Sequence, residues 1–252
     1  MPYIEERCTA GRTVEVTKYY SYHYGKHWVR GEYKAPTKEA VKKSNKRQAV
    51  KKLRRLLNAN FKDGEDCLIT CTFRPEDRPE TYKDLLKIAQ LFVRRLRKEY
   101  KAYNYPLRYI YVLEKGPGKK GDGSDGAVHI HMVVSWNHAM IFARCWTWGY
   151  PPKVEILGSD GQYAKIAEYF MKYSNKTEKT LEELGEKIGK AYYPSKNLVH
   201  PEPVKRVVHA NKFKEKPRVP KGYRLDKESE RSGISELTGM PFYGYTIIKM
   251  RC

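Results

Sequence analysis

Two histidines separated by one residue lie in a short apolar run whose spacing suits a metal site. His129 and His131 belong to the run AVHIHMVVS, residues 127–135. Side chains alternate across a β-strand, so both imidazoles would face one side of a sheet and their apolar neighbours the other. Imidazoles on such a strand need a metal, a phosphate or hydrogen bonds. For the pair alone, two histidines satisfied by nearby backbone or carboxylate groups are the more common arrangement.

An acidic residue, Glu114, favours the metal interpretation. It lies near the end of the run RYIYVLEK, residues 108–115, and the glycine-rich segment Gly116–Gly126 separates this run from the histidine strand. If the two runs form a hairpin, Glu114 lies near the start of the histidine strand. One carboxylate and two neutral imidazoles suit Mg²⁺ or Mn²⁺. We therefore predict a metal site formed by His129, His131 and Glu114, although an isolated glutamate would be assigned to a surface salt bridge.

A candidate nucleophile comes from a helical pattern at Gly161–Lys176. At about 100° per residue, Tyr169 stands in a row of polar residues. The other members of that row are Lys165, Lys172, Tyr173 and Lys176. Lysines beside a phenol would lower its pKa from about 10 and would attract a phosphate. The alternative is an amphipathic helix whose tyrosines pack and whose lysines are solvated.

The rest of the pattern predicts the elements that would position these groups. Strands are expected at Cys67–Phe73, Arg108–Lys115, Ala127–Ser135 and Lys153–Leu157, and helices at Thr81–Tyr100, Asn137–Thr147, Gly161–Lys176 and Thr180–Gly189. The first six elements follow the split βαβ, ferredoxin-like order. We therefore predict an α+β fold with a central antiparallel sheet flanked by helices.

The flanking regions predict additions to this core. Thr13–Tyr24 is rich in Val, Thr and Tyr and predicts one or two strands. Lys38–Arg55 carries nine basic residues against Glu39 alone, and its apolar stripe predicts a helix capped by Thr37 and ending near Asn58–Asn60. Beyond Tyr192 we expect an irregular region with a final strand at Tyr243–Lys249. The predicted domains are residues 1–60, a core at 61–191 that contains the candidate site, and residues 192–252, with both flanks packed on the core.

Composition narrows the class of protein. The 252 residues carry 50 Lys and Arg against 29 Asp and Glu, a net charge of +21, which points to a polyanionic partner. Five cysteines without paired CxxC spacing argue against a disulfide scaffold and a structural zinc site. No apolar run is long enough for a membrane helix, and the first residues contain no signal-peptide core, so a cytoplasmic protein is expected. No GxxxxGK[ST] motif for ATP occurs.

Three motifs in chain order resemble those of the HUH endonucleases, specifically the rolling-circle replication initiators of plasmids, phages and integrative elements. Leu68–Phe73 is similar to that family's apolar first motif. His129-Ile130-His131 matches its His-hydrophobe-His metal motif, and Glu114 fits the acidic residue that often completes the site. Tyr169-Phe170-Met171-Lys172 matches its Tyr-x-x-Lys motif, and Tyr173 matches the second tyrosine of the YxxKY variant.

This resemblance implies a specific reaction. Tyr169 would attack a phosphodiester and remain covalently attached to the 5′ phosphate, with Lys172 near the phosphate and Mg²⁺ or Mn²⁺ held by His129, His131 and Glu114. The substrate would be single-stranded or hairpin origin DNA, and a host helicase and DNA polymerase would be partners. The basic helix at Lys38–Arg55 would follow the DNA backbone. Whether Tyr173 is a second nucleophile, or instead binds DNA or packs, stays open.

Other functions remain compatible with the sequence. Within the same chemistry, the protein could be a HUH transposase or a relaxase, although relaxases usually use three histidines and compact transposases are generally shorter. A different class is a non-catalytic, RRM-like nucleic-acid-binding module, for which Tyr109 and Tyr111 could stack on bases. No RNP1-type run supports that class.

Overall fold

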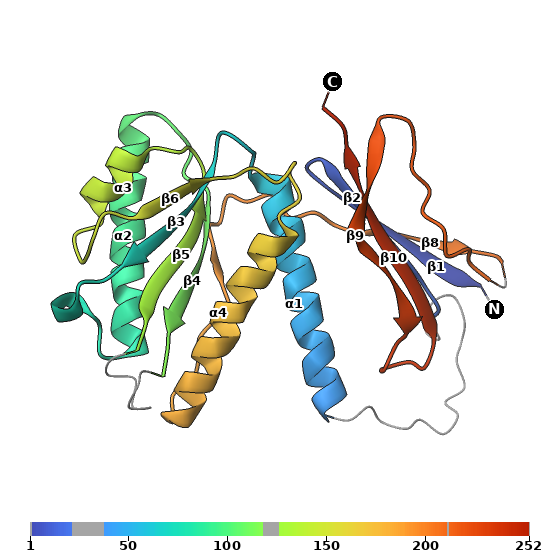
Figure 1. Ribbon diagram of the computed structural model, residues 1–252, viewed down its shortest axis with the longest axis horizontal. Coiled ribbons are helices and arrows are strands. Elements are labelled where there is room, and N and C mark those ends of the chain that lie inside the picture. The colour runs from blue at the N-terminus through green and yellow to red at the C-terminus, as the bar shows by residue number, and fades with distance from the viewer. Residues whose placement is uncertain (1, 22–37, 118–125, 211, 252) are drawn as a thin grey trace. The chain divides into compact units, whose positions relative to one another are not determined.

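The structure is a computed structural model that describes residues 2–21, 38–117, 126–210 and 212–251 (Figure 1). Within these residues the chain forms two compact units, each with its own five-stranded antiparallel sheet. Unit 1 contains residues 1–59, 160–162 and 199–252, and unit 2 contains residues 60–159 and 163–198. The predicted α+β class is confirmed, but the flanks form a second sheet where a single central sheet was predicted. Their predicted packing on the core stays a prediction.

None of the helices in the described part of the chain has the length and apolar character needed to cross a membrane.

Unit 2 has the predicted split βαβ order. Its elements are β3 (Cys67–Thr72), the short 3₁₀ helix η1 (Pro75–Asp77), α2 (Tyr82–Ala102), β4 (Tyr109–Lys115), β5 (Val128–Val134), α3 (Ala139–Cys145), β6 (Lys153–Ile156), α4 (Ala164–Glu183) and β7 (Tyr193–Pro194). The strand order across the sheet is β6-β3-β5-β4-β7, so β5 is central and β3 and β4 flank it. Helices α2 and α3 lie on one side of this sheet and α4 on the other (Figure 1).

The main core of unit 2 lies between the sheet and α2. Thr81 caps α2 by accepting a hydrogen bond from the backbone N–H of Asp84 at 3.1 Å. The buried face of the helix presents Leu85, Ala89, Phe92, Val93 and Leu96. These side chains join alternate residues of the strands, including Ile69, Ile130 and Met132, in one apolar cluster. Because strand residues alternate, His129 and His131 of β5 face the opposite side, toward α4.

Two helix predictions in unit 2 need correction. The predicted helices at Gly161–Lys176 and Thr180–Gly189 are one continuous helix, α4, because buried Thr177 and Thr180 continue the apolar face through the segment where a break was expected. Helix α3 begins after His138, not after Asn137, and the His138 side chain makes no capping hydrogen bond.

Unit 1 is formed by segments from both ends of the chain. Its elements are β1 (Tyr3–Ala10), β2 (Thr13–Tyr19), α1 (Lys38–Asn60), β8 (Val204–Val208), β9 (Tyr223–Ile234) and β10 (Pro241–Lys249), with strand order β8-β1-β2-β10-β9. The predicted strand and helix at β2 and α1 are confirmed, as is the final strand, while Thr37 and residues 22–24 lie outside the described residues. Strands β1, β8 and β9 were not predicted. Strands β8 and β9 are edge strands. Their many charged residues leave no clear alternation of apolar and polar residues from which a strand could be predicted.

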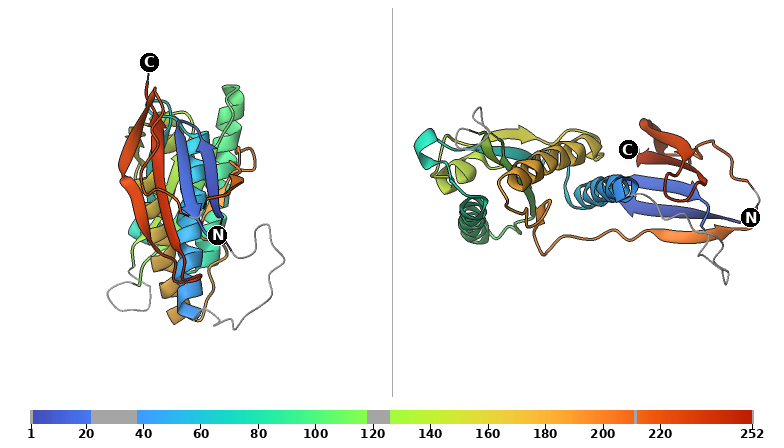
Figure 2. Two further views of the ribbon diagram at one scale, coloured as in Figure 1. Left: turned by 90° about the vertical axis from the view of Figure 1, so that its right-hand side faces the viewer. Right: turned by 90° about the horizontal axis from the view of Figure 1, so that it is seen from below.

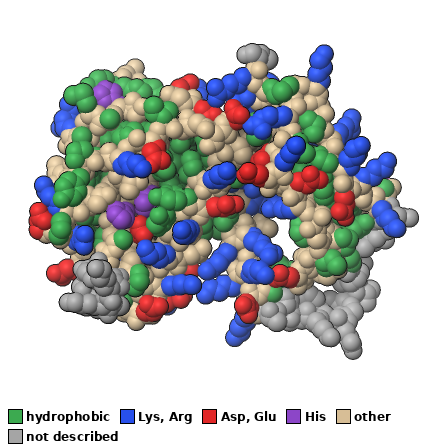
Figure 3. Space-filling model, in the orientation of Figure 1, with side chains coloured by type: hydrophobic (Ala, Val, Ile, Leu, Met, Phe, Trp, Pro, Cys, Tyr) green, Lys and Arg blue, Asp and Glu red, His purple; other side chains and the backbone are tan. Residues whose placement is uncertain are grey.

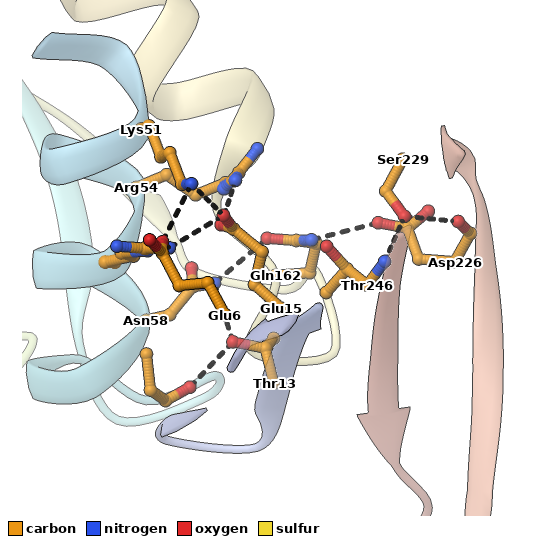
Figure 4. A network of polar contacts seen from close by, with 12 residues as sticks. Glu6, Thr13, Glu15, Lys51, Arg54, Asn58, Gln162, Asp226, Ser229 and Thr246 are labelled. Atoms are coloured by element: carbon orange, nitrogen blue, oxygen red, sulfur yellow. Dashed lines mark hydrogen bonds and ion pairs between the residues drawn. The ribbon is translucent and has the colours of Figure 1, made fainter. Parts of the chain in front are cut away.

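A buried ion network joins α1 to the sheet of unit 1 (Figure 4). Glu15 of β2 pairs with Lys51 at 3.0 Å and with Arg55 at 2.9 Å, and also with Arg54. Glu6 of β1 pairs with Lys51 at 3.1 Å and with Arg55 at 2.9 Å. The sequence analysis expected the basic helix to contact the DNA backbone. Three of its cations, Lys51, Arg54 and Arg55, instead form ion pairs within unit 1, and their side chains are only 11–14% exposed.

The charge of Glu15 stabilises unit 1 only while its carboxyl is ionised. Burial alone would raise the pKa of Glu15, but Arg54, Lys51 and Arg55 outweigh burial and lower it to about 2. The stabilisation is therefore complete above a pH of about 4.5, the ordinary value, and is lost as the pH falls toward 2.

We predict that Glu15→Gln lowers the free energy of unfolding of unit 1 by about 3 kcal/mol, because it leaves buried cations without their counter-charge. The measurement is urea denaturation at pH 7, with hydrogen exchange of β2 amides to assign the loss to this unit. The exposed Glu202→Gln is the control and should change little. Equal stability of the two variants, or wild-type stability that does not fall between pH 4.5 and 2, would contradict this account.

Candidate metal and nucleophile site

The hairpin of β4 and β5 places the predicted metal ligands opposite one another. In the antiparallel register Glu114 pairs with His129, and Val112 pairs with His131. Directly opposed residues have Cβ atoms about 4.5–5.5 Å apart, and residues two apart on a strand share a face. The hairpin therefore brings one carboxylate and two imidazoles together, as the sequence predicted, although most of its connecting loop lies outside the described residues.

The Glu114 carboxylate is the centre of this cluster. One of its oxygens, Oε2, lies 2.8 Å from His129 Nδ1 and 3.1 Å from His131 Nε2. The other, Oε1, accepts a hydrogen bond from Lys176 Nζ at 2.9 Å. Burial alone would raise the pKa of the carboxyl, but the hydrogen bonds from His129, His131 and Lys176 hold it well below its usual range. Glu114 is therefore ionised at neutral pH while only 2% exposed.

The donor set fits a divalent cation. Glu114, His129 and His131 each offer one ligand atom, and these atoms lie within 4.8 Å of one another. A buried carboxylate with two imidazoles supplies oxygen and nitrogen donors and leaves positions open for substrate oxygens. His129 is the most exposed of the three, with 26% of its side chain accessible, so the cluster is reached from one side. In the space-filling view, histidine side chains reach the surface with Lys and Arg side chains nearby (Figure 3).

A single threonine on α4 fixes this helix beside Glu114. The Thr177 hydroxyl accepts from the backbone N–H of Lys115 and donates to the carbonyl of Leu113, both at 3.0 Å. Strand β7 pairs only with Ile110 and Tyr111, so the outer edge of β4 beyond that point has no strand partner among the described residues. The Thr177 hydroxyl provides the hydrogen-bond partner of two backbone groups at this edge, and its side chain is fully buried. The sequence analysis did not identify Thr177; its one signal is a polar residue on the buried face of the helix.

The two tyrosines of α4 contact His131. The Tyr169 hydroxyl lies 3.3 Å from His131 Nδ1. The Tyr173 ring stacks on the His131 ring with centroids 4.4 Å apart, and the Tyr169 and Tyr173 rings meet edge to face at 4.6 Å. Thr70 of β3 also places its hydroxyl 3.3 Å from His131 Nδ1. The predicted nucleophile and the predicted metal ligands thus form one constellation, and Thr70 is a further member that sequence reasoning did not assign a role.

The pKa of Tyr169 shifts in the direction opposite to the one expected. Burial raises the pKa of this phenol, and the neighbouring Tyr173 hydroxyl and the carboxylate of Glu114 raise it further. The lysine row was predicted to lower it. The negative charge of Glu114 lies close to the phenol, whereas the predicted phosphate-binding Lys172 is exposed. The phenol is therefore protonated at neutral pH in the protein alone.

Lys172 and Lys176 occupy different places in the site. Lys176 reaches Glu114 and has 42% of its side chain exposed. Lys172 lies one turn earlier on α4 and is exposed, and its predicted contact with a phosphate stays a prediction. The sequence placed both lysines in the row of Tyr169, but helical spacing alone does not show which of them contacts the carboxylate.

The fold and the cluster together define an α+β unit with a candidate divalent-metal centre beside two tyrosines. Residues 66–178 match the family model described as replication-associated protein ORF2/G2P. That range is less than half of the chain and contains every residue of the site, and the match confirms the predicted resemblance only at the level of a replication-associated protein family. A search of curated proteins and a search of solved structures each found no match.

We predict that the wild-type protein binds Mn²⁺ and that Glu114→Gln weakens binding at least about tenfold, because the variant loses the one carboxylate of the cluster. Isothermal titration with Mn²⁺ measures the change. Glu155→Gln is the matched control, since Glu155 is an exposed glutamate of the same sheet outside the cluster. Mn²⁺ affinity that is equal in the two variants would exclude Glu114 as a ligand.

We predict that Thr177→Val lowers the free energy of unfolding by about 2 kcal/mol, because it leaves the buried N–H of Lys115 without a partner. Urea denaturation measures the loss, and faster hydrogen exchange of the Lys115 amide localises it. Thr180→Val is the control: it also removes a buried hydroxyl, but that hydroxyl bonds within α4, to the Lys176 carbonyl. Slow, unchanged exchange at Lys115 in Thr177→Val would show that Thr177 does not hold the two elements together.

Proposed function

We propose that this protein is a metal-dependent DNA endonuclease and nucleotidyltransferase of the HUH type that acts in replication, which the family match supports. It would nick single-stranded or hairpin origin DNA and initiate rolling-circle replication of a plasmid, phage or mobile element. The observation that carries the proposal is the continuous path from the Tyr169 hydroxyl to His131 Nδ1, 3.3 Å, and from His131 Nε2 to Glu114, 3.1 Å. A nucleophile is thereby held against a candidate metal centre.

The reaction exchanges one phosphodiester for another without ATP. A bond forms between the Tyr169 oxygen and phosphorus, and the bond from phosphorus to the 3′ oxygen breaks. The Tyr169 hydroxyl loses its proton to water, the 5′ phosphate stays on the tyrosine, and the departing oxygen takes a proton from water to become a 3′-OH that a polymerase can extend. Mg²⁺ or Mn²⁺ bound by Glu114, His129 and His131 would supply Lewis-acid polarisation of a non-bridging phosphate oxygen. Lys172 would offset negative charge on the phosphate.

His131 couples the cluster to the nucleophile through its two nitrogens. With its proton on Nε2, the ring donates to Glu114, and Nδ1 accepts from the Tyr169 hydroxyl. With its proton on Nδ1, the Nε2 lone pair is available for ligation, and Nδ1 donates to the Tyr169 oxygen or to Thr70. In the second tautomer the Nδ1–H of His131 would donate to a phenolate at Tyr169. If His131 held a cation through Nε2, this ring would therefore stabilise the ionised nucleophile, although burial raises the pKa of Tyr169 in the protein alone.

The buried aromatics of the sheet weigh against the non-catalytic, RRM-like alternative. That class of module stacks bases on aromatic residues exposed on strands. Tyr111 is 4% exposed and belongs to the apolar core beneath α2, and Tyr109 packs against the same core. The two tyrosines that contact His131, Tyr169 and Tyr173, lie on helix α4 and not on a strand.

We predict that Tyr169→Phe abolishes a covalent protein–DNA adduct, because it removes the attacking oxygen while keeping the ring. The assay incubates the protein with a labelled single-stranded origin oligonucleotide and Mn²⁺ and resolves products on a denaturing gel. Tyr173→Phe, one turn away on the same helix, is the control and should retain adduct formation. An adduct that persists in Tyr169→Phe and disappears in Tyr173→Phe would assign the nucleophile to Tyr173.

A further inference from the structure

Unit 1 carries most of the net charge of the protein. Its sequence contains 27 Lys and Arg against 12 Asp and Glu, whereas unit 2 contains 23 against 17. Several of its acidic groups are engaged internally. Glu6 and Glu15 bind the cations of α1, Asp160 pairs with Arg224 at 2.8 Å, and Glu236 pairs with Lys43 at 3.0 Å. These pairs leave unit 1 with an excess of Lys and Arg over acidic groups.

One segment concentrates this charge. Residues 212–221, which we call the basic strap, connect β8 to β9 and contain five Lys and Arg against Glu215 alone. All five are exposed: Lys212, Lys214, Lys216, Arg218 and Lys221. Lys and Arg side chains also line the margin of the protein over β8 and the chain that follows it (Figure 3).

The basic strap is held on the sheet face that α1 does not cover. In the right-hand view of Figure 2, the chain after β8 runs on the other side of β1 and β2 from α1. The Phe213 ring packs against Tyr3 and Tyr20, with centroids 5.5 and 5.4 Å away. Lys18 donates to the Lys214 carbonyl at 3.1 Å, and the Arg218 N–H donates to the Tyr245 hydroxyl at 3.1 Å. Buried anchors thus fix the backbone while the cationic side chains point outward.

The side chains on this surface fit a phosphate backbone better than unpaired bases. Surfaces that bind single strands combine cations with accessible aromatic rings on which bases stack. Phe213 is the one aromatic residue of the basic strap, and its ring packs against the rings of Tyr3 and Tyr20. Cations without stacking rings suit duplex DNA, whose bases are already stacked and whose phosphates provide most of the non-specific affinity.

We propose that the basic strap is a docking surface for duplex DNA, separate from the nicking site of unit 2. This inference rests on the proposed function for the identity of the polyanion as DNA. The basic strap would hold the double-stranded DNA that flanks the nick site through its phosphates and without reading sequence.

The test compares two full-length variants that lose the same charge. One changes Lys212, Lys214, Lys216 and Arg218 to Gln; the control changes Lys83, Arg94, Lys98 and Lys101, exposed residues of α2 in unit 2, to Gln. Fluorescence anisotropy measures affinity for a 5′-labelled duplex of generic sequence, and for a single strand of equal length, over a range of NaCl concentrations. Each phosphate that the protein no longer neutralises should reduce the salt slope for the duplex by about 0.9. We expect a reduction of about 3.6 in the strap variant, which loses four cations, and little change in the control.

Equal duplex slopes for the two variants would overturn the proposal, as would a strap variant that loses single-strand and duplex affinity to the same extent. Acetylation of lysines in the wild-type protein provides a readout without substitutions. Bound duplex should protect Lys212, Lys214 and Lys216 but not Lys83 and Lys98, and absence of that protection would also overturn the proposal. Adduct formation on a saturating short single strand should be unchanged in the strap variant. If the wild type itself forms no adduct, the proposed function fails while the duplex titration still tests the basic strap.

Discussion

One buried negative charge, the carboxylate of Glu114, organises the candidate site. A carboxylate removed from water is costly unless it is paired and hydrogen-bonded. Here two imidazoles and an ammonium group surround it, from the opposing strand β5 and from helix α4. The same contacts fix the orientation of His131, and the Tyr169 hydroxyl lies 3.3 Å from its Nδ1. The candidate metal ligands and the proposed nucleophile are therefore joined by one set of contacts.

Lys and Arg side chains have two different structural roles in unit 1. Near the C-terminal end of α1, Lys51, Arg54 and Arg55 turn inward and neutralise Glu6 and Glu15, so they hold the helix on the sheet. In the basic strap, backbone and aromatic anchors hold the segment in place, and the cations face outward. A run of positive charge in a sequence thus does not by itself identify a DNA-binding surface, because the position of buried acids decides which cations remain accessible.

The features of the site that could be predicted from the sequence are those that follow from residue periodicity and from the order of the motifs. The alternation in AVHIHMVVS placed both histidines on one face, and the hairpin placed Glu114 beside them. The helical spacing placed Tyr169 only in a row of lysines, and the motif resemblance implied that it lies beside the histidines. The sequence did not predict that Lys176, and not Lys172, contacts Glu114. Two lysines one turn apart on the same helix face cannot be distinguished until the position of α4 on the sheet is known. The contact between Thr177 and β4 was not predicted, because it depends on where β7 stops pairing with β4. That point is a property of the sheet and not of the helix. Strand β9 was missed because an edge strand can be polar on both faces.

The measurement that tests the central claim most directly is identification of the covalently modified residue. The wild-type protein is incubated with Mn²⁺ and a single-stranded origin oligonucleotide, digested with nuclease and protease, and analysed by mass spectrometry. Our account predicts a peptide whose nucleotide phosphate is attached to the oxygen of Tyr169, formed only when a divalent metal is present. An adduct at a residue remote from Glu114, His129 and His131, or an equal yield of adduct in excess chelator, would contradict it.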